Sequence, residues 1–131
     1  MYKLSVVTQE KVLFEEDVSS LIAPGAQGYL GILTDHAPLI TSLVPGKLTI
    51  KDTSGNENFY AISGGFLEVS NNRATILADA VEPLEDIDLS RAESALQRAR
   101  ERLQKQEDID LERARKAKER AENRLKLKKG R

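Results

Sequence analysis

The chain has 131 residues, 40% of them hydrophobic, and its 20 Lys or Arg against 21 Asp or Glu give a net charge of -1. This length suffices for one small core with an appendage and leaves little room for two full domains. With no Cys and one His, the sequence excludes disulfides, thiolate nucleophiles and metal sites built from several Cys or His ligands.

The beginning of the chain shows no secretory signal. Residues 1–5 lack a charged lead followed by an apolar core, and no apolar run in the chain approaches the roughly 20 residues of a membrane span. We therefore expect a soluble protein that is not exported.

The first 83 residues have the pattern of a β-sheet domain. Short segments such as Lys47–Lys51 alternate apolar and polar residues between turn residues. Ser54-Gly55-Asn56 and Asn71-Asn72 tolerate the positive φ angles of tight hairpins, so Phe66–Val69 is expected to pair with Ala74–Leu77. These patterns predict an antiparallel β-sandwich or flattened barrel of about eight to ten short strands.

Two further positions shape this domain. Gly64-Gly65 is expected to permit a bulge or a close approach of two sheets. Pro83 disfavours helix at Glu82 and lies where the composition changes to Ala, Arg and Glu. The sequence therefore predicts a β-sandwich domain over residues 1–83 and a second unit over residues 84–131.

The second unit contains a repeat. The segment Asp86 to Ala92 returns 22 residues later as Asp108 to Ala114. Asp88 and Asp110 are each placed to cap a helix, since a carboxylate oxygen can accept from the free NH groups of the first turn. We expect an antiparallel hairpin of two helices with its turn near residues 104–108.

Leu and Ala recur at spacings of three and four and would form the seam between the helices. The seam positions are Leu89, Ala92, Leu96, Ala99 and Leu103 in the first helix and Leu111, Ala114, Lys118, Ala121 and Leu125 in the second. Alanine lets two backbones approach closely, but such a seam buries little surface, and Lys118 interrupts it. The hairpin is therefore predicted to depend on docking to the sandwich or to another protein.

Charge is distributed unevenly. Residues 111–131 hold ten Lys or Arg and three Asp or Glu, a net of +7, whereas residues 1–110 hold ten and eighteen, a net of -8. A helix this basic favours an acidic protein surface, an anionic ligand or a nucleic acid. The alternative is a solvated helix face that complements the helix dipole.

No pattern predicts a catalytic or metal site. His36 follows Asp35, but neighbours on a turn rarely form an acid–base pair, and we expect His36 to bond backbone or to touch a partner. The segment Gly25 to Gly31 lacks the dinucleotide fingerprint, and no phosphate loop is present. We therefore expect a protein that is not an enzyme and requires no cofactor.

An ordered set of motifs resembles the epsilon-subunit family of F-type ATP synthases. The motifs are Gly28–Thr41, Pro45-Gly46, Ser63–Val69 and Thr75–Asp79, followed by the acidic-capped Ala and Arg hairpin. The resemblance covers nearly the whole chain and implies a non-catalytic subunit at the foot of a rotating central stalk. The implied partners are the gamma subunit, the membrane ring of c subunits and the alpha/beta catalytic hexamer.

The resemblance also implies roles for residues of the sandwich. Gln27, Gly28 and Tyr29 would face the polar loops of the c-ring, and His36 would lie near gamma. Some members carry an acidic residue at the position of Tyr29, so stacking or hydrogen bonding would replace a charge contact here. The alternative for Tyr29 is an ordinary aromatic residue of an edge strand.

In this family the hairpin either folds against the sandwich or extends along gamma into the hexamer, where it blocks ATP hydrolysis. A weak seam would make both arrangements accessible. Arg113, Arg115, Lys116 and Arg120 are the candidates to contact the acidic carboxyl-terminal region of a beta subunit in the extended state.

Some bacterial members bind ATP on the folded hairpin, and their motif is similar to Ile87–Ala92 here. The implied ATP contacts are Glu82, Ile87, Asp88, Arg91, Ala92, Arg120 and Arg124. Guanidinium groups from both helices would hold the phosphates, with Glu82 and nearby backbone at the adenine. Alternatively, Asp88 only caps the helix and the arginines pair with Glu on solvated faces.

A different class of function is a nucleic-acid-binding adaptor that uses the basic last helix. The basic segment has no aromatic residue for base stacking, and the rest of the chain is acidic. We therefore expect no nucleic acid partner. The implied location is the cytoplasmic side of a bacterial plasma membrane, with a thylakoid or plastid as the alternative.

Overall fold

The computed structural model describes residues 1–105 and 111–130, with side chains for all of these except residues 102–105, 111 and 112. The backbone divides into two compact units, Met1–Pro83 and Leu84–Arg131. The predicted cap Asp110 and residues 106–108 of the predicted turn lie outside the described residues, as do the side chains of Leu103 and Leu111.

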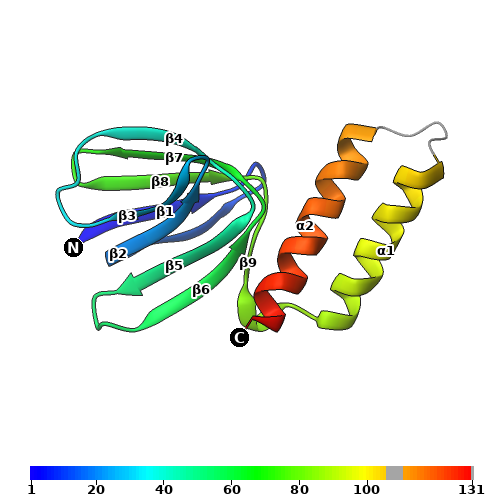
Figure 1. The fold of residues 1–131 in the computed structure, drawn as a ribbon. Coiled ribbons are helices and arrows are strands. Elements are labelled where there is room, and N and C mark those ends of the chain that lie inside the picture. The colour runs from blue at the N-terminus through cyan, green and yellow to red at the C-terminus, as the bar shows by residue number, and fades with distance from the viewer. Residues whose placement is uncertain (106–110, 131) are drawn as a thin grey trace. The chain divides into compact units, whose positions relative to one another are not determined.

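The first unit is a β-sandwich of nine strands within residues 1–83, as the strand pattern predicts (Figure 1). The strands are β1 (Tyr2–Val7), β2 (Val12–Gly25), β3 (Gly28–Ile32), β4 (Leu39–Leu43), β5 (Gly46–Asp52), β6 (Glu57–Ile62), β7 (Gly65–Ser70), β8 (Arg73–Ala78) and β9 (Val81–Pro83).

The strands are hydrogen-bonded in the order β1-β8-β7-β4-β2-β5-β6-β9, with β3 paired to β2 at the edge. The long β2 also pairs with β1 through its first half, and this pairing closes five of the strands into a ring. One pair departs from the expected antiparallel pattern, because β1 and β8 run parallel. Parallel neighbours need a long connection, and almost the whole domain lies between these two strands.

The predicted β7–β8 hairpin is confirmed. Phe66 pairs with Leu77, and Val69 pairs with Ala74. The turn residues Asn71 and Asn72 have φ angles of 52° and 57°, which match the right-handed twist of the flanking strands.

Gly64-Gly65 permits a close approach, but between neighbouring strands of one sheet and not between two sheets as predicted. The φ angles are 120° and 147°, where a side chain is strained. A Cβ atom on Gly65 would collide with the carbonyl oxygen of Leu77 and lie 2.9 Å from the Cα atom of Ala78. Strand β7 therefore begins against the backbone of β8, at a point where only glycine fits.

The core lies inside the closed sheet, between its opposed inner sides. Its fully buried large side chains include Leu4, Val18, Leu21, Ile32, Leu48, Ile62, Leu67 and Ile76. Tyr2 joins this core and donates a hydrogen bond from its hydroxyl to the carbonyl oxygen of Ile32 at 2.7 Å. Burial raises the pKa of the Tyr2 hydroxyl, so the group stays protonated and keeps donating.

The second unit comprises the short 3-10 helix η1 (Leu84–Asp86) and the helices α1 (Leu89–Lys105) and α2 (Leu111–Lys129), which pack antiparallel (Figure 1). The predicted cap is confirmed, because Oδ1 of Asp88 accepts from the backbone NH of Arg91 at 3.1 Å. Within the part of the chain that the structure describes, neither helix is apolar over a length that could cross a bilayer.

The predicted Ala and Leu seam is confirmed at most described positions. The buried seam residues are Ala92, Leu96, Ala99, Ala114 and Ala121. Leu89 remains 37% exposed, because it lies in the first turn of α1, before the packed part of the helix. Lys118 keeps its charge accessible and pairs with Glu122 at 3.6 Å along α2.

Two contacts join the end of α2 to the beginning of the second unit. Nζ of Lys128 donates to the carbonyl oxygen of Leu84 at 3.4 Å, and Nζ of Lys129 lies 3.8 Å from Oε1 of Glu93. The ion pair is more than half exposed on both sides, so solvent screening leaves it little stabilising effect. Small apolar side chains and these weak polar contacts hold the hairpin closed.

Candidate functional site

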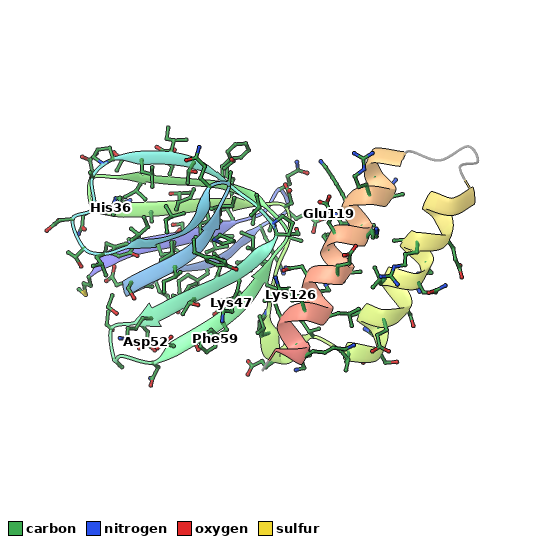
Figure 2. All side chains as sticks on the ribbon, in the orientation of Figure 1. His36, Lys47, Asp52, Phe59, Glu119 and Lys126 are labelled. Carbon is green, nitrogen blue, oxygen red and sulfur yellow. The ribbon has the colours of Figure 1, made fainter. Side chains whose placement is uncertain are left out.

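His36 lies in the loop between β3 and β4 (Figure 2). Its Nδ1 donates to the carbonyl oxygen of Ala37 at 2.8 Å, which confirms the expected backbone bond. The preceding residue Asp35 has a φ of 59°, and its NH donates to Oδ1 of Asn72 at 2.8 Å. The loop that carries His36 is thereby fastened to the β7–β8 turn.

The other candidate contact in the sandwich is the tip of the β2–β3 hairpin. Gly25 pairs with Gly28, so Ala26 and Gln27 alone form the turn. Ala26, Gln27 and Gly28 are all exposed, and Gly28 has a φ of 126°. The tip therefore offers backbone groups and one amide side chain to a partner.

Tyr29 follows this tip on edge strand β3. Its side chain is 58% exposed, yet its hydroxyl accepts a hydrogen bond from the backbone NH of Lys47 at 3.0 Å. Gly46 makes the approach possible, because a Cβ atom there would lie 2.8 Å from the Tyr29 hydroxyl oxygen. Tyr29 thus fastens the hairpin tip to the start of β5.

The structure does not bring these candidates together. Gln27, Gly28 and Tyr29 stand at the beginning of β3, whereas His36 comes after its other end. In Figure 2, His36 and Lys47, the residue that holds Tyr29, lie at different ends of the sandwich. The candidate residues therefore lie in two separate regions of the sandwich.

A third region is apolar and was not predicted from the sequence. Ile40, Phe66 and Leu77 are 76%, 59% and 55% exposed on the outer face of β4, β7 and β8, and together they form what we call the outer apolar surface. Phe66 and Leu77 are direct cross-strand neighbours. Their inward neighbours Leu67 and Ile76 are fully buried. In β7 and β8, both the inward-facing and the outward-facing positions carry apolar residues. This pattern could have indicated the surface from the sequence.

The candidate contacts on α2 differ in exposure. Arg113, Arg115 and Lys116 are exposed, whereas Arg120 is half-buried. Positions 113, 116 and 120 repeat at intervals of three and four, so these residues share one face of the helix. The first half of α2 therefore presents a concentrated positive surface.

The candidate ATP contacts occupy both units. Ile87 and Ala92 are buried, and their backbone NH groups donate to the carbonyl oxygens of Leu84 and Asp88. Arg91 is exposed, and Asp88 caps α1. Arg120 and Arg124 are half-buried and lie one turn apart on α2. The remaining candidate, Glu82, belongs to β9 in the first unit.

Comparison with known families accounts for the whole chain. The description "ATP synthase, Delta/Epsilon chain, beta-sandwich domain" matches residues 1–84. The description "ATP synthase, Delta/Epsilon chain, long alpha-helix domain" matches residues 85–108 and again residues 107–131. The chain belongs to the ATP synthase delta/epsilon family. The two matches of the helix domain correspond to the two copies of the repeat.

Similar proteins within the ATP synthase delta/epsilon family are ATP synthase epsilon chains, which confirms the resemblance. That of Carboxydothermus hydrogenoformans is 52% identical over 104 residues, 79% of this chain and 77% of the relative. Those of Pelotomaculum thermopropionicum and Protochlamydia amoebophila are 50% and 47% identical over 79% of this chain, covering 77% and 71% of their own lengths.

Solved structures agree on the fold. A chain of the Euglena gracilis mitochondrial ATP synthase OSCP/F1/c-ring assembly matches with a TM-score of 0.77 and 28% identity, over 92% of this chain and 76% of that one. A chain of the Tetrahymena thermophila ATP synthase central stalk and c-ring matches with a TM-score of 0.61 and 18% identity, over 96% and 95%.

Proposed function

We propose that this chain is a non-catalytic rotor subunit that joins gamma to the ring of c subunits in a proton-translocating F-type ATP synthase and regulates ATP hydrolysis through its hairpin. Membership in the ATP synthase delta/epsilon family supports the proposal. So does the likeness to a chain of an assembly that contains F1 and a c-ring. The subunit works at the cytoplasmic side of a bacterial plasma membrane.

The observation that carries the proposal is the outer apolar surface. Ile40, Phe66 and Leu77 keep more than half of their surface in contact with solvent, which is costly unless a protein partner covers them. We assign this surface and the neighbouring His36 loop to gamma. The test is binding of the full chain to a purified rotor of gamma and c subunits, compared with variants of Phe66 and Leu77.

The c-ring contact is assigned to the tip formed by Gln27, Gly28 and Tyr29. The Tyr29 hydroxyl accepts from the backbone NH of Lys47, and its O–H group can donate a hydrogen bond to the ring. The Gln27 amide and exposed backbone at Gly28 complete the contact. The tip thus offers hydrogen bonds where an acidic residue would offer charge.

The positive face of α2 is assigned to a beta subunit in an extended state of the hairpin. Changing Arg113, Arg115, Lys116 and Arg120 together to Gln is expected to weaken inhibition of ATP hydrolysis about tenfold, since exposed charge pairs contribute up to ~1 kcal/mol each. Hydrolysis by the reconstituted complex is measured across a range of salt concentrations. The change Lys126→Gln, further along α2, is the control. Unchanged inhibition with unchanged salt dependence would show that charge does not hold the extended state.

ATP is assigned to the folded hairpin as a regulatory ligand. Excess ATP is expected to raise the thermal midpoint of the full chain. A ligand at 100 times its dissociation constant stabilises the folded state against unfolding by ~2.7 kcal/mol. Arg91→Ala is expected to abolish the rise by removing a phosphate contact. Arg100→Ala is the matched control, since position 100 lies on the opposite face of α1. Millimolar ATP that gives neither stabilisation nor binding heat rejects the assignment.

A further inference from the structure

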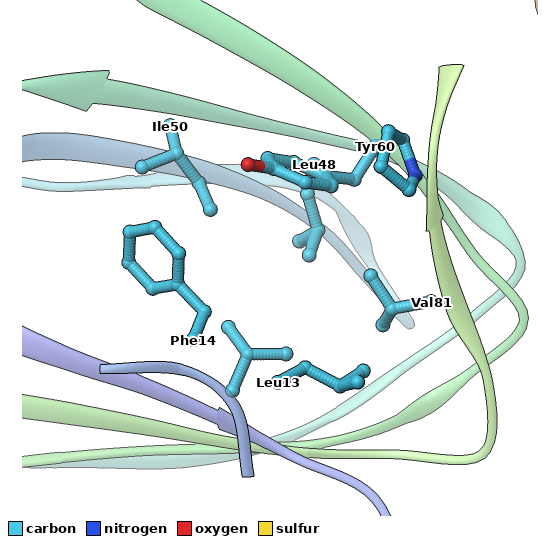
Figure 3. Close-up of a pocket in the computed structure, with 8 residues that line it drawn as sticks. Leu13, Phe14, Leu48, Ile50, Tyr60 and Val81 are labelled. Carbon is cyan, nitrogen blue, oxygen red and sulfur yellow. The ribbon is translucent and has the colours of Figure 1, made fainter. Parts of the chain in front are cut away.

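An apolar cavity of ≈ 220 Å³ lies inside the first unit (Figure 3). Leu13 and Phe14 of β2 lie on one side of the space, and Leu48, Ile50 and Tyr60 on the other. Strands β1 and β9 complete its wall, and the lining residues are Val6, Leu13, Phe14, Leu48, Ile50, Tyr60, Val81 and Pro83. Protein cores seldom leave a space this large between well-packed side chains.

A β-bulge builds one wall of the cavity. Val6 of β1 pairs with Phe14, but Val7 pairs with Val12, so Leu13 is an extra residue without a partner in β1. In a regular strand, consecutive side chains point to opposite faces, yet Leu13 and Phe14 both line the cavity. Bulges re-aim side chains in this way, often beside functional sites.

The lining defines the chemistry of a ligand. Val6, Leu48 and Ile50 are at most 2% exposed and form an apolar floor, and Leu13, at 38%, lies at the opening. No Lys, Arg, Asp or Glu lines the space. Residues 1–83 carry five Lys or Arg against ten Asp or Glu, so the domain would repel an anion. An uncharged apolar molecule fits the apolar lining and is not repelled by the negative charge of the domain.

The size also fits such a molecule. An apolar cavity of ~150 Å³ stays dry and takes up benzene, because its lining lacks partner atoms until a ligand supplies them. The space here is larger. It therefore accommodates an aromatic ring with a substituent or a short hydrocarbon chain.

We propose that this cavity is a binding site for an uncharged apolar small molecule. Val81 and Pro83 belong to the three-residue strand β9, which pairs with β6 and ends where the chain enters the second unit. A bound molecule adds contacts to this short strand and slows its opening. The cavity is thereby a site at which a neutral ligand stabilises the last strand before the hairpin.

The test uses the full chain with toluene and 1-hexanol as neutral probes and hexanoate as the charged counterpart of hexanol. Methyl NMR signals of Val6, Leu48, Ile50 and Val81 are expected to shift with the neutral probes in a saturable manner. Hexanoate is expected to bind about tenfold more weakly or worse. Amide exchange at residues 81 and 82 is expected to slow when a neutral probe is bound. Shifts that are absent, or that appear equally at the exposed Ile40 and Leu77, overturn the proposal.

A filled cavity provides the matched variant. Val81→Phe places a larger side chain in the space and is expected to abolish the probe-induced shifts, whereas Ile40→Phe, on the exposed outer face, is expected to leave them intact. Probe binding that survives Val81→Phe overturns the proposal. Should that variant fail to fold, competition between toluene and 1-hexanol for the wild-type chain decides. Mutual displacement supports one shared site, and independent binding rejects it.

Discussion

Replacing Gly65 with Ala is expected to lower the free energy of unfolding of the β-sandwich by about 3–5 kcal/mol, one of the largest effects a single methyl group can have. Gly65 has a φ of 147°, and an added Cβ atom would collide with the carbonyl oxygen of Leu77. Because β7 and β8 are hydrogen-bonded at this point, the collision can be relieved only by separating the two strands. Urea denaturation followed by amide NMR signals of β7 and β8 measures the change.

Gly55→Ala is the matched control for this prediction. Gly55 also has a positive φ, 91°, but nothing lies within 4 Å of the position where its Cβ atom would be. Only the intrinsic cost of the left-handed conformation remains, about 1–2 kcal/mol. Equal destabilisation by the two changes would mean that backbone strain alone, and not the contact with β8, requires glycine at position 65.

Two side chains, one aromatic and one aliphatic, lie at the centre of the outer apolar surface. Removing both is expected to weaken binding to gamma by about 30-fold to 1000-fold, equivalent to ~2–4 kcal/mol. The double change is Phe66→Ala with Leu77→Ala. Both side chains are mostly exposed, so their loss leaves the core of the sandwich intact. Affinity for purified gamma, measured by calorimetry alongside the thermal midpoint of the variant, separates lost contact from lost fold.

Truncating an exposed apolar side chain elsewhere on the sandwich tests whether the loss of gamma binding depends on the location of the change. Ile22 is 44% exposed on β2, outside the outer apolar surface, and Ile22→Ala is expected to leave gamma binding within about twofold. Retained gamma affinity in the double variant would contradict the assignment of this surface. It would leave membership in the ATP synthase delta/epsilon family untouched.

Local signals made much of the fold predictable. Asn71-Asn72 specifies its hairpin because both residues accept positive φ, and the register of β7 and β8 follows from that turn. The repeat in the second unit locates both helices, and Asp88 marks the start of the first through its capping bond. In each case, residues that are neighbours in the sequence determine the local structure.

Features that depend on distant residues were not predictable in the same way. Nothing in residues 2–7 indicates a parallel partner some seventy residues further on, because alternation shows that a segment is a strand without showing its neighbour. The bulge at Leu13 and the bond from Lys47 to the Tyr29 hydroxyl likewise depend on register between separate strands. These are the details that shape the cavity and the hairpin tip.

The candidate sites differ in the same way. Some are indicated by short motifs, whereas others are made of residues from separate strands. The resemblance named Tyr29 and Arg91 from short motifs, without indicating which neighbours hold them. The outer apolar surface has no motif at all, because Ile40, Phe66 and Leu77 come from three strands. Residues gathered from separate strands become a recognisable surface only when the sheet is assembled.

The parallel pairing of β1 with β8 has a consequence for how the protein is made. Strand β1 cannot complete its hydrogen bonds until residues 73–77 have been synthesised. During that interval β1 has an unpaired edge, and contacts between such distant residues form slowly, in milliseconds to seconds for β-rich domains. The nascent chain therefore passes through an aggregation-prone stage that the helical part, which depends on contacts between neighbouring segments, does not share.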